Sequence, residues 1–148
     1  MKNYFSRLMS SAKKSEFIVW WIFRLIMIGA MVSLLFTNPP SDLPKTQMAL
    51  QLFANLVGMF AWEIIQALPE KTCLRQLPSY CQTVASVGLL LASFGGAFLN
   101  FYYSIFMWDK ILHLLGGAEA VFMGYELATA MQKRDKKQCD LPIVLLCA

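Results

Sequence analysis

Apolar residues dominate this 148-residue chain in four blocks, each about 20 residues long and nearly free of charged side chains. A helix rises about 1.5 Å per residue, so a block of this length crosses a hydrocarbon core of roughly 30 Å. Helices of soluble proteins show a charged face instead. The predicted spans cover residues 17–37, 48–68, 84–107 and 111–131. We therefore expect an all-α fold, a polytopic transmembrane helical bundle with four full spans.

A fifth apolar stretch covers residues 141–148, where the sequence stops. Eight helical residues extend about 12 Å, which is too short to cross a bilayer. This stretch is either the start of a fifth span or a tail at the interface, and we favour a truncated product or fragment. The length and the hydrophobic content of 57% fit a single membrane domain over residues 1–148.

The distribution of Lys and Arg predicts the orientation of the bundle. Ten basic residues fall in the N-terminal arm, between the second and third spans, and after the fourth span. The loops on the opposite side hold only Lys45 and Lys110. Because basic residues accumulate on the cytoplasmic side, we expect a cytoplasmic N-terminus. The net charge of +4 then reflects topology and contact with anionic lipid, and it indicates no nucleic-acid partner.

Small residues recur at every fourth position on the third and fourth predicted spans. The two stripes are Gly88, Ala92, Gly96 and Asn100, and Gly116, Ala120, Gly124 and Ala128. Small side chains let helices approach closely in lipid, where apolar surface alone does not drive association. Only a few residues connect the two spans, so the helices should be antiparallel neighbours. We expect them to pack through these stripes.

Four Arg and Glu side chains lie inside the predicted spans, where an unpaired charge costs about 3 kcal/mol or more. This polar membrane cluster consists of Arg24, Glu63, Glu119 and Glu126. Three of them, all but Glu119, fall roughly 6–10 Å from the cytoplasmic ends of their spans. We expect an Arg–Glu pairing there, as an inter-helix clamp or as a proton or substrate site. Glu119 stands alone near mid-depth, and a purely structural role explains it least.

A second group of polar side chains is expected near the outer ends of the spans. This outer polar cluster consists of Gln51, Asn55, Asn100, Asp109 and His113. Asp109 and His113 are four residues apart on one helical face, where a carboxylate can orient an imidazole that acts as a base or binds a metal. Alternatively, Asp109 caps the helix and His113 bonds to a neighbouring helix. Both residues are candidates for catalysis, and the presence of a metal stays open. We expect His113 to face the interior of the bundle, with Asp109 or Asn100 within hydrogen-bond reach.

The fourth span begins with an aromatic residue, Asp and Lys, followed by His and Gly at intervals of four residues: Trp108, Asp109, Lys110, His113 and Gly117. This pattern resembles a motif of the YjdF-like bacterial multi-pass membrane proteins, a family of unknown function. VanZ-like membrane proteins carry a similar start to a membrane helix. The resemblance implies a location in a bacterial cytoplasmic membrane.

Two further positions match the YjdF-like pattern. An acidic residue near the end of the same helix falls on Glu126, and an aromatic–Glu pair falls on Trp62 and Glu63. The resemblance covers about residues 48–131, and Glu119 is not part of the pattern. Since the family has no settled activity, the resemblance implies site residues and no function.

Three functions stay open. The first is a small transporter or proton-coupled permease-like protein, with the polar membrane cluster lining a path. The second is a membrane enzyme that acts on a lipid-linked substrate through Asp109 and His113. The third is a structural or partner-binding subunit, as a homo-oligomer or with another membrane protein. Broken helices would favour transport, but no predicted span contains Pro. We expect the lipid bilayer as a partner, no established enzymatic activity and no cofactor, since the four cysteines follow no metal-binding spacing.

Overall fold

The computed structural model describes residues 4–38, 43–69 and 72–135, and this part of the chain is helical without a strand. The apolar stretch 141–148 lies outside the described residues. The long helices are α2 (Lys14–Phe36), α3 (Lys45–Gly58), α5 (Tyr80–Leu90) with the π-helix η2 (Leu91–Phe98), and α7 (Trp108–Asp135). The short ones are α1 (Tyr4–Ser11), α4 (Ala61–Ala67), the 3-10 helix η1 (Cys73–Gln76) and α6 (Phe101–Ser104). The all-α prediction is confirmed.

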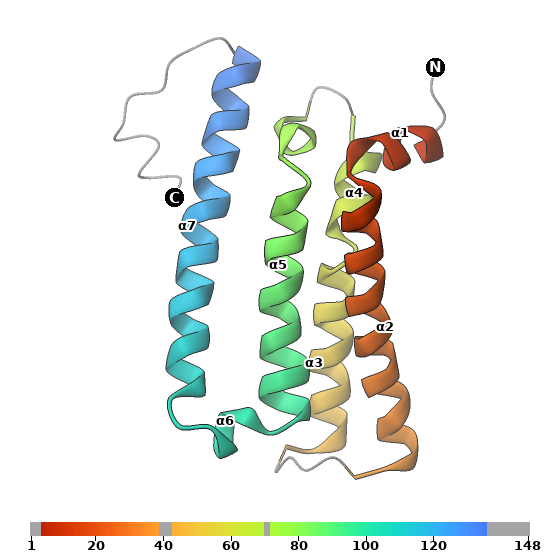
Figure 1. Ribbon diagram of the computed structural model, residues 1–148, viewed down its shortest axis with the longest axis vertical. Coiled ribbons are helices and arrows are strands. Elements are labelled where there is room, and N and C mark those ends of the chain that lie inside the picture. Colours follow the sequence, from red (N-terminus) through yellow and green to blue (C-terminus); the bar gives the residue numbers. More distant parts are fainter. Residues whose placement is uncertain (1–3, 39–42, 70–71, 136–148) are drawn as a thin grey trace.

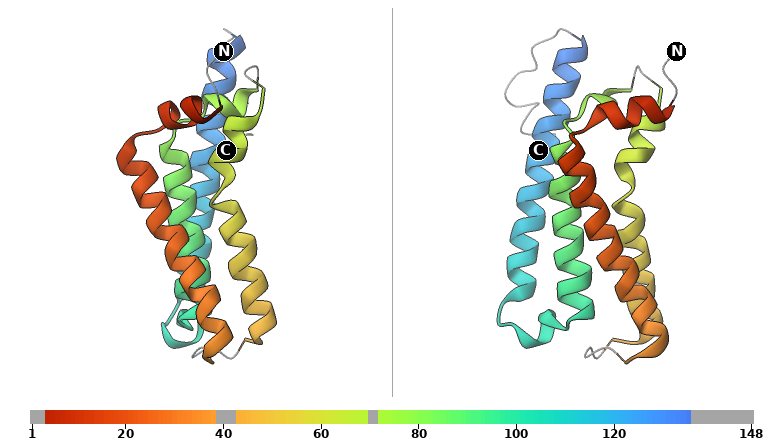
Figure 2. Two further views of the ribbon diagram at one scale, coloured as in Figure 1. Left: turned by 90° about the vertical axis from the view of Figure 1, so that its right-hand side faces the viewer. Right: turned by 45° about the vertical axis from the view of Figure 1, so that its right-hand side comes forward.

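The long helices run side by side in an elongated bundle (Figure 1). Helix α5 contacts α2, α3 and α7, so it lies between α7 and the pair formed by α2 and α3. Helix α1 lies across one end of the bundle, beside α4, and η1 and the C-terminal end of α7 are at the same end (Figures 1 and 2). Helix α6 lies at the opposite end. The segments with most of the basic residues therefore share the end that carries α1.

Two helical segments in the described part of the chain are long and apolar enough to cross a membrane. They are α2 and the continuous segment Tyr80–Phe98. Helices α3 and α4 together are also long and apolar enough, but they are bent by 41° at the break between them. They count as a third span if the pair crosses the membrane as one broken span. Helix α7 has 28 residues but is not among these segments, because His113, Glu119 and Glu126 interrupt its apolar sequence. Length and composition thus give two or three spans rather than four.

The second predicted span is not one continuous helix. Helix α3 ends at Gly58, and α4 begins at Ala61 after a break at Met59 and Phe60. Glycine is among the poorest helix formers, and a break there leaves nearby backbone groups in need of other partners. The expectation of an uninterrupted helix over 48–68 is wrong, although no Pro is present.

The third predicted span ends earlier than expected. The helix over Tyr80–Phe98 stops before Asn100, whose φ of 62° is left-handed, and Met107 has a φ of 61°. Asn tolerates this conformation better than most residues because its short polar side chain can bond locally. The residues after Asn100 form the separate turn α6, so a single span over 84–107 is wrong.

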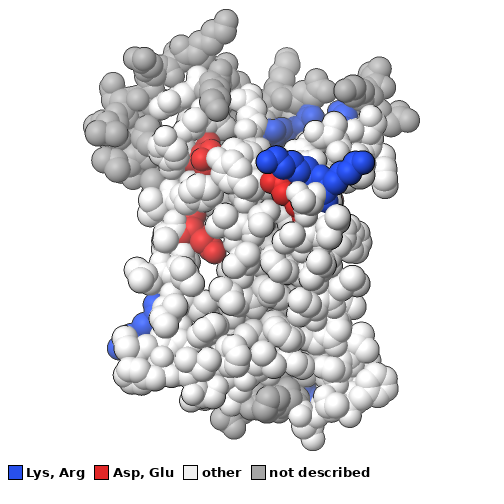
Figure 3. Space-filling view, in the orientation of Figure 1, with Lys and Arg blue, Asp and Glu red and all other residues white. Residues whose placement is uncertain are grey.

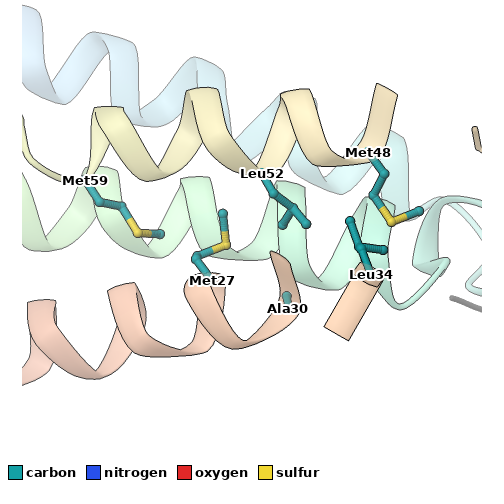
Figure 4. Close-up of a cluster of buried hydrophobic side chains, with 6 residues drawn as sticks. All are labelled: Met27, Ala30, Leu34, Met48, Leu52 and Met59. Carbon is teal, nitrogen blue, oxygen red and sulfur yellow. The ribbon is translucent and has the colours of Figure 1, made fainter. Parts of the chain in front are cut away.

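The interior of the bundle is apolar where α2 meets α3. A cluster of fully or nearly fully buried side chains fills this contact, and Figure 4 shows them pointing toward one another: Met27, Ala30, Leu34, Met48, Leu52 and Met59. Side chains of η2, such as Phe94 and Phe98, pack against the cluster. Methionine is flexible enough to fill the irregular gaps between such helices.

Large apolar side chains also cover the outside of the bundle. On α2 alone, Ile18, Leu25, Leu35 and Phe36 are exposed, the last by 80%. Figure 3 shows a broad band of the surface that is uncharged apart from acidic side chains on α7. Soluble monomers rarely expose contiguous apolar surface of this extent, whereas a lipid-facing surface requires it.

The expected packing through small stripes holds for part of the contact. Gly88 of α5 faces α7, and Gly124 and Ala128 of α7 are buried. In contrast, the ring of Tyr102 from α6 covers Gly96, and Gly116 faces open space. The stripe prediction is therefore wrong at Gly96 and Gly116, because the third span ends early and α6 comes between it and α7.

Candidate functional site

A buried ion pair joins α2 to α4. The guanidinium of Arg24 is 0% exposed, and its Nη1 and Nη2 atoms lie 2.7 and 2.8 Å from the two carboxylate oxygens of Glu63. The Glu63 side chain is 22% exposed. The Nη2 contact is a charge-assisted hydrogen bond, whereas the Nη1 contact is an ion pair without hydrogen-bond geometry. The sequence predicts that Arg24 pairs with a Glu of the second or of the fourth span, and the structure shows the pair with the second.

The same guanidinium binds the backbone at the break between α3 and α4. Nη2 and Nε of Arg24 donate to the Met59 carbonyl at 2.6 and 3.2 Å. Gln82 of α5 donates to that carbonyl at 2.8 Å and to the Ser86 hydroxyl at 3.1 Å. A carbonyl at a helix break has lost its usual amide partner, so side-chain donors must satisfy it in an apolar interior. We call this group, with Glu63, the Arg24 clamp.

Aromatic rings enclose the Arg24 clamp. The Arg24 guanidinium lies 4.0 Å from the ring centre of Phe60 and 5.3 Å from that of Trp21. Both contacts are within the range of cation–π attraction. The Tyr4 hydroxyl of α1 donates to the Glu63 carbonyl at 2.8 Å, so α1 closes the clamp from the end of the bundle. This geometry favours an inter-helix clamp over an open substrate site.

Glu119 lies in a different place, on the side of α7 that faces α5. A Cβ atom added at Gly88 would lie 2.6 Å from Oε1 of Glu119, so only glycine leaves room for the carboxylate in this position. A pocket of about 280 Å³ opens beside it, lined by Val84, Leu115, Ala118, Glu119 and Phe122. Figure 3 shows acidic side chains on α7 in a hollow of this face. Within the described residues, no side chain forms a hydrogen bond or ion pair with Glu119.

Glu126 belongs to the same contact and not to the Arg24 clamp. It accepts a hydrogen bond of 2.7 Å from the Tyr80 hydroxyl of α5, and the Tyr80 ring lies 5.8 Å from that of Phe122. The similar depth of Glu126 and Arg24 along their helices does not bring them together, because α5 separates α7 from α2. The polar membrane cluster is thus two centres: the Arg24 clamp and the α5–α7 groove, which carries Glu119 and Glu126.

The outer polar cluster does not assemble. His113 Nε2 lies 3.4 Å from Asp109 Oδ1, but the two side chains are 82% and 62% exposed. The expectation that His113 faces the interior is wrong for this chain. Asn100 has a buried Oδ1 atom without a donor, and Asn55 donates to the Ser93 hydroxyl of η2. Gln51 is partly buried on α3.

No group of three or more His, Cys, Asp and Glu side chains that could hold a metal ion is found among the residues that the structure describes. Sequence reasoning missed Tyr80 and Gln82 because it started the third span at residue 84, and it did not single out Ser86 inside that span. The spacing of Gln82 and Ser86, one helical turn apart, would have placed both on one face had the span begun at residue 80.

Comparisons with known proteins find one uncharacterized relative and assign no function to the chain. The chain is 34% identical over 79 residues to an uncharacterized protein of Thermotoga maritima. The match covers 53% of this chain and 40% of that relative, so the chain spans well under half of the relative's length. No protein-family model matches the chain, and no solved structure matches it.

Proposed function

We propose that this chain is a multi-pass integral membrane protein in which Glu119 is a protonatable site of proton-coupled transport. The apolar outer surface of α2 and the two or three candidate spans support the membrane location. In this proposal α7 is a further crossing beside α5, and the end of the bundle that carries α1 faces the cytoplasm. The membrane is a bacterial cytoplasmic membrane, as the resemblance to YjdF-like proteins implies.

The observation that carries the proposal is Glu119 itself. Its carboxylate has no described hydrogen-bond partner, sits opposite a glycine that leaves it room, and lines a pocket of about 280 Å³. Intramembrane carboxylates are costly, and they mark proton relays and ion paths in pumps and transporters. The break between α3 and α4 supports the same class of function, since transporters use broken helices.

Reaction with dicyclohexylcarbodiimide tests the proposal, because this apolar reagent modifies protonated carboxyl groups in apolar surroundings. The full chain in liposomes is treated at mildly acidic and at alkaline pH, and the modified peptides are identified by mass spectrometry. We expect modification of Glu119 that falls as the pH rises, and none at this position in E119Q. Modification of Glu63 or Glu126 with an unreactive Glu119 would contradict the proposal.

A second candidate is a partner-binding subunit, which the open face of α7 favours. Asp109 and His113 are exposed, and a Cβ atom added at Gly116 or Gly117 would meet nothing within 4 Å. A cysteine at position 117 should then form cross-links in native membranes, to a second copy or to another membrane protein. A cysteine at the exposed position 25 of α2 is the control.

A further inference from the structure

We infer that the Glu119 pocket binds a small organic cation with an apolar body, in exchange for the proton on Glu119. This inference rests on the proposed function and names the class of substrate for that site. It follows from three properties of the pocket: the chemistry of its lining, its access and its size.

The lining combines one acidic side chain with apolar ones. Glu119 is the only ionisable group of the pocket, and Val84, Leu115, Ala118 and Phe122 supply the remaining surface. An anion would be repelled by the carboxylate, and a neutral ligand would leave it without a partner at a cost in free energy. A positively charged group beside the carboxylate, with an apolar body against the other side chains, satisfies both parts of the lining.

A metal ion fits this lining poorly. Hard cations such as Ca²⁺ require about six to eight oxygen ligands, and Mg²⁺ keeps several waters. The lining offers the two oxygens of Glu119 and apolar carbon. An alkylammonium ion spreads its charge over apolar surface and can lie against the ring of Phe122, as quaternary ammonium ions do on aromatic side chains. Organic cations are therefore preferred over inorganic ones.

The pocket is open toward the surroundings of the bundle, along the α5–α7 groove. Leu115 and Ala118 are exposed, so a ligand can reach Glu119 from the lipid phase without separation of the helices. The volume of about 280 Å³ is close to the lower end of the 300–1,000 Å³ that ligand pockets usually have. A ligand with one aromatic ring and one compact cationic group fits this size.

Exchange follows from charge balance at a single carboxyl group. A protonated Glu119 is neutral and offers no charge to a cation, whereas the ionised form attracts it. Binding of one cation to the protonated site therefore releases one proton, and acidification releases the cation again. Such mutual exclusion at one site couples the movement of the two species.

Phenyltrimethylammonium and its neutral isostere tert-butylbenzene test this inference, since they differ in charge and hardly in shape. Binding to the full chain in nanodiscs is measured by saturation-transfer NMR, with empty nanodiscs to correct for partition into lipid. We expect E119Q to weaken binding of the cation about tenfold or more and to leave the neutral compound unchanged. The variant E126Q, which removes the charge of the group that accepts the bond from Tyr80 but keeps Glu119, should retain cation binding.

Protection of the wild-type protein avoids reliance on a variant that fails to fold. Phenyltrimethylammonium should slow the modification of Glu119 by dicyclohexylcarbodiimide, and tert-butylbenzene should not. Equal binding of both compounds, or unchanged cation binding by folded E119Q, would overturn the inference. If Glu119 still reacts in a pH-dependent way but the cation neither binds nor protects, the proton site stands and the class of substrate is wrong.

Discussion

Arg24 of α2 reaches across the bundle to Glu63 of α4, and the two side chains make two contacts of 2.7 and 2.8 Å beside the break between α3 and α4. Arg24 also donates twice to the Met59 carbonyl at that break. One buried cation thus neutralises an acidic side chain and satisfies a backbone group that the broken helix leaves free. The conformation of the second predicted span therefore depends on a residue of the first.

Substitution of one partner of this pair should destabilise the bundle strongly. E63Q leaves the Arg24 guanidinium buried with no opposite charge, at an expected cost of about 3–5 kcal/mol in the free energy of unfolding. R24M removes the two bonds from Arg24 to the Met59 carbonyl as well as the charge and leaves only that from Gln82, so it should cost no less. Denaturation in mixed micelles, followed by circular dichroism, measures both effects.

E126Q is the matched control, since it alters a carboxylate whose only described partner is the exposed Tyr80 hydroxyl. It should change the free energy of unfolding by less than about 1 kcal/mol. The double variant R24M/E63Q should recover part of the loss, because no charge remains unpaired. Equal stability of E63Q and E126Q would show that the Arg24 clamp does not hold the helices.

The Arg24–Glu63 pair was predictable from sequence because a charged group in an apolar span needs an opposite charge at a similar depth. The break between α3 and α4 was not, since residues 48–68 contain Gly58 but no Pro. Contacts from other helices stabilise this break, since Arg24 and Gln82 donate to the Met59 carbonyl. The pattern of residues within one helix does not include the side chains of other helices that bond to its backbone at the break.

The α5–α7 groove was predictable only in part. The antiparallel neighbours and the isolation of Glu119 followed from the short connection and from the depth of the residue. Glu119 lies against Gly88 only at a particular rotation of the two helices about their axes, which the sequence does not give. The early end of the third span also changed which residues of the small stripes face each other.

Substitution of Gly88 should alter the Glu119 site with little effect on folding. The Cβ atom of G88A would lie 2.6 Å from Oε1 and 2.8 Å from Cδ of Glu119. Because the carboxylate ends a flexible side chain, it can swing away while the helix backbones stay in place. We expect slower modification of Glu119 by dicyclohexylcarbodiimide, with a free energy of unfolding within about 1 kcal/mol of wild type.

G116A provides the control for this variant, since its Cβ atom would meet nothing within 4 Å. It should leave the modification rate of Glu119 unchanged. If G88A and G116A behave alike, the carboxylate does not lie over Gly88.

The orientation of the bundle can be tested with two matched serines. Ser10 of α1 and Ser104 of α6 are both exposed, and each donates to a carbonyl of its own turn. In a chain without its native cysteines, S104C should react with a membrane-impermeant maleimide in intact cells. S10C should react only after the membrane is opened, because basic segments stay in the cytoplasm. The reverse pattern would invert the proposed topology.

Substitutions of Asn100 test where the third span ends, because the order of stability of N100G and N100A depends on the conformation at this position. With a φ of 62°, Asn100 occupies a conformation that Gly adopts without cost and that Ala adopts at about 1–2 kcal/mol. Its side-chain oxygen has no donor, so removal of the amide breaks no described bond to Oδ1. N100G should therefore be at least as stable as wild type, and N100A should be less stable by about 1 kcal/mol.

If residues 84–107 formed a regular helix, as the hydrophobic pattern predicts, the order of stability of N100G and N100A would be reversed. In a helix interior, Gly is about 1 kcal/mol less favourable than Ala, so N100G would then be the less stable variant. Unfolding of both proteins under the same conditions thus separates the two descriptions without a structure of either. The early end matters for the site as well, because it lets α6 bring Tyr102 over Gly96. The contact between α5 and α7 then includes Gly88 opposite Glu119 and the bond from Tyr80 to Glu126. If N100A is more stable than N100G, the third span continues past Asn100. The structural reason for the Glu119 pocket is then lost.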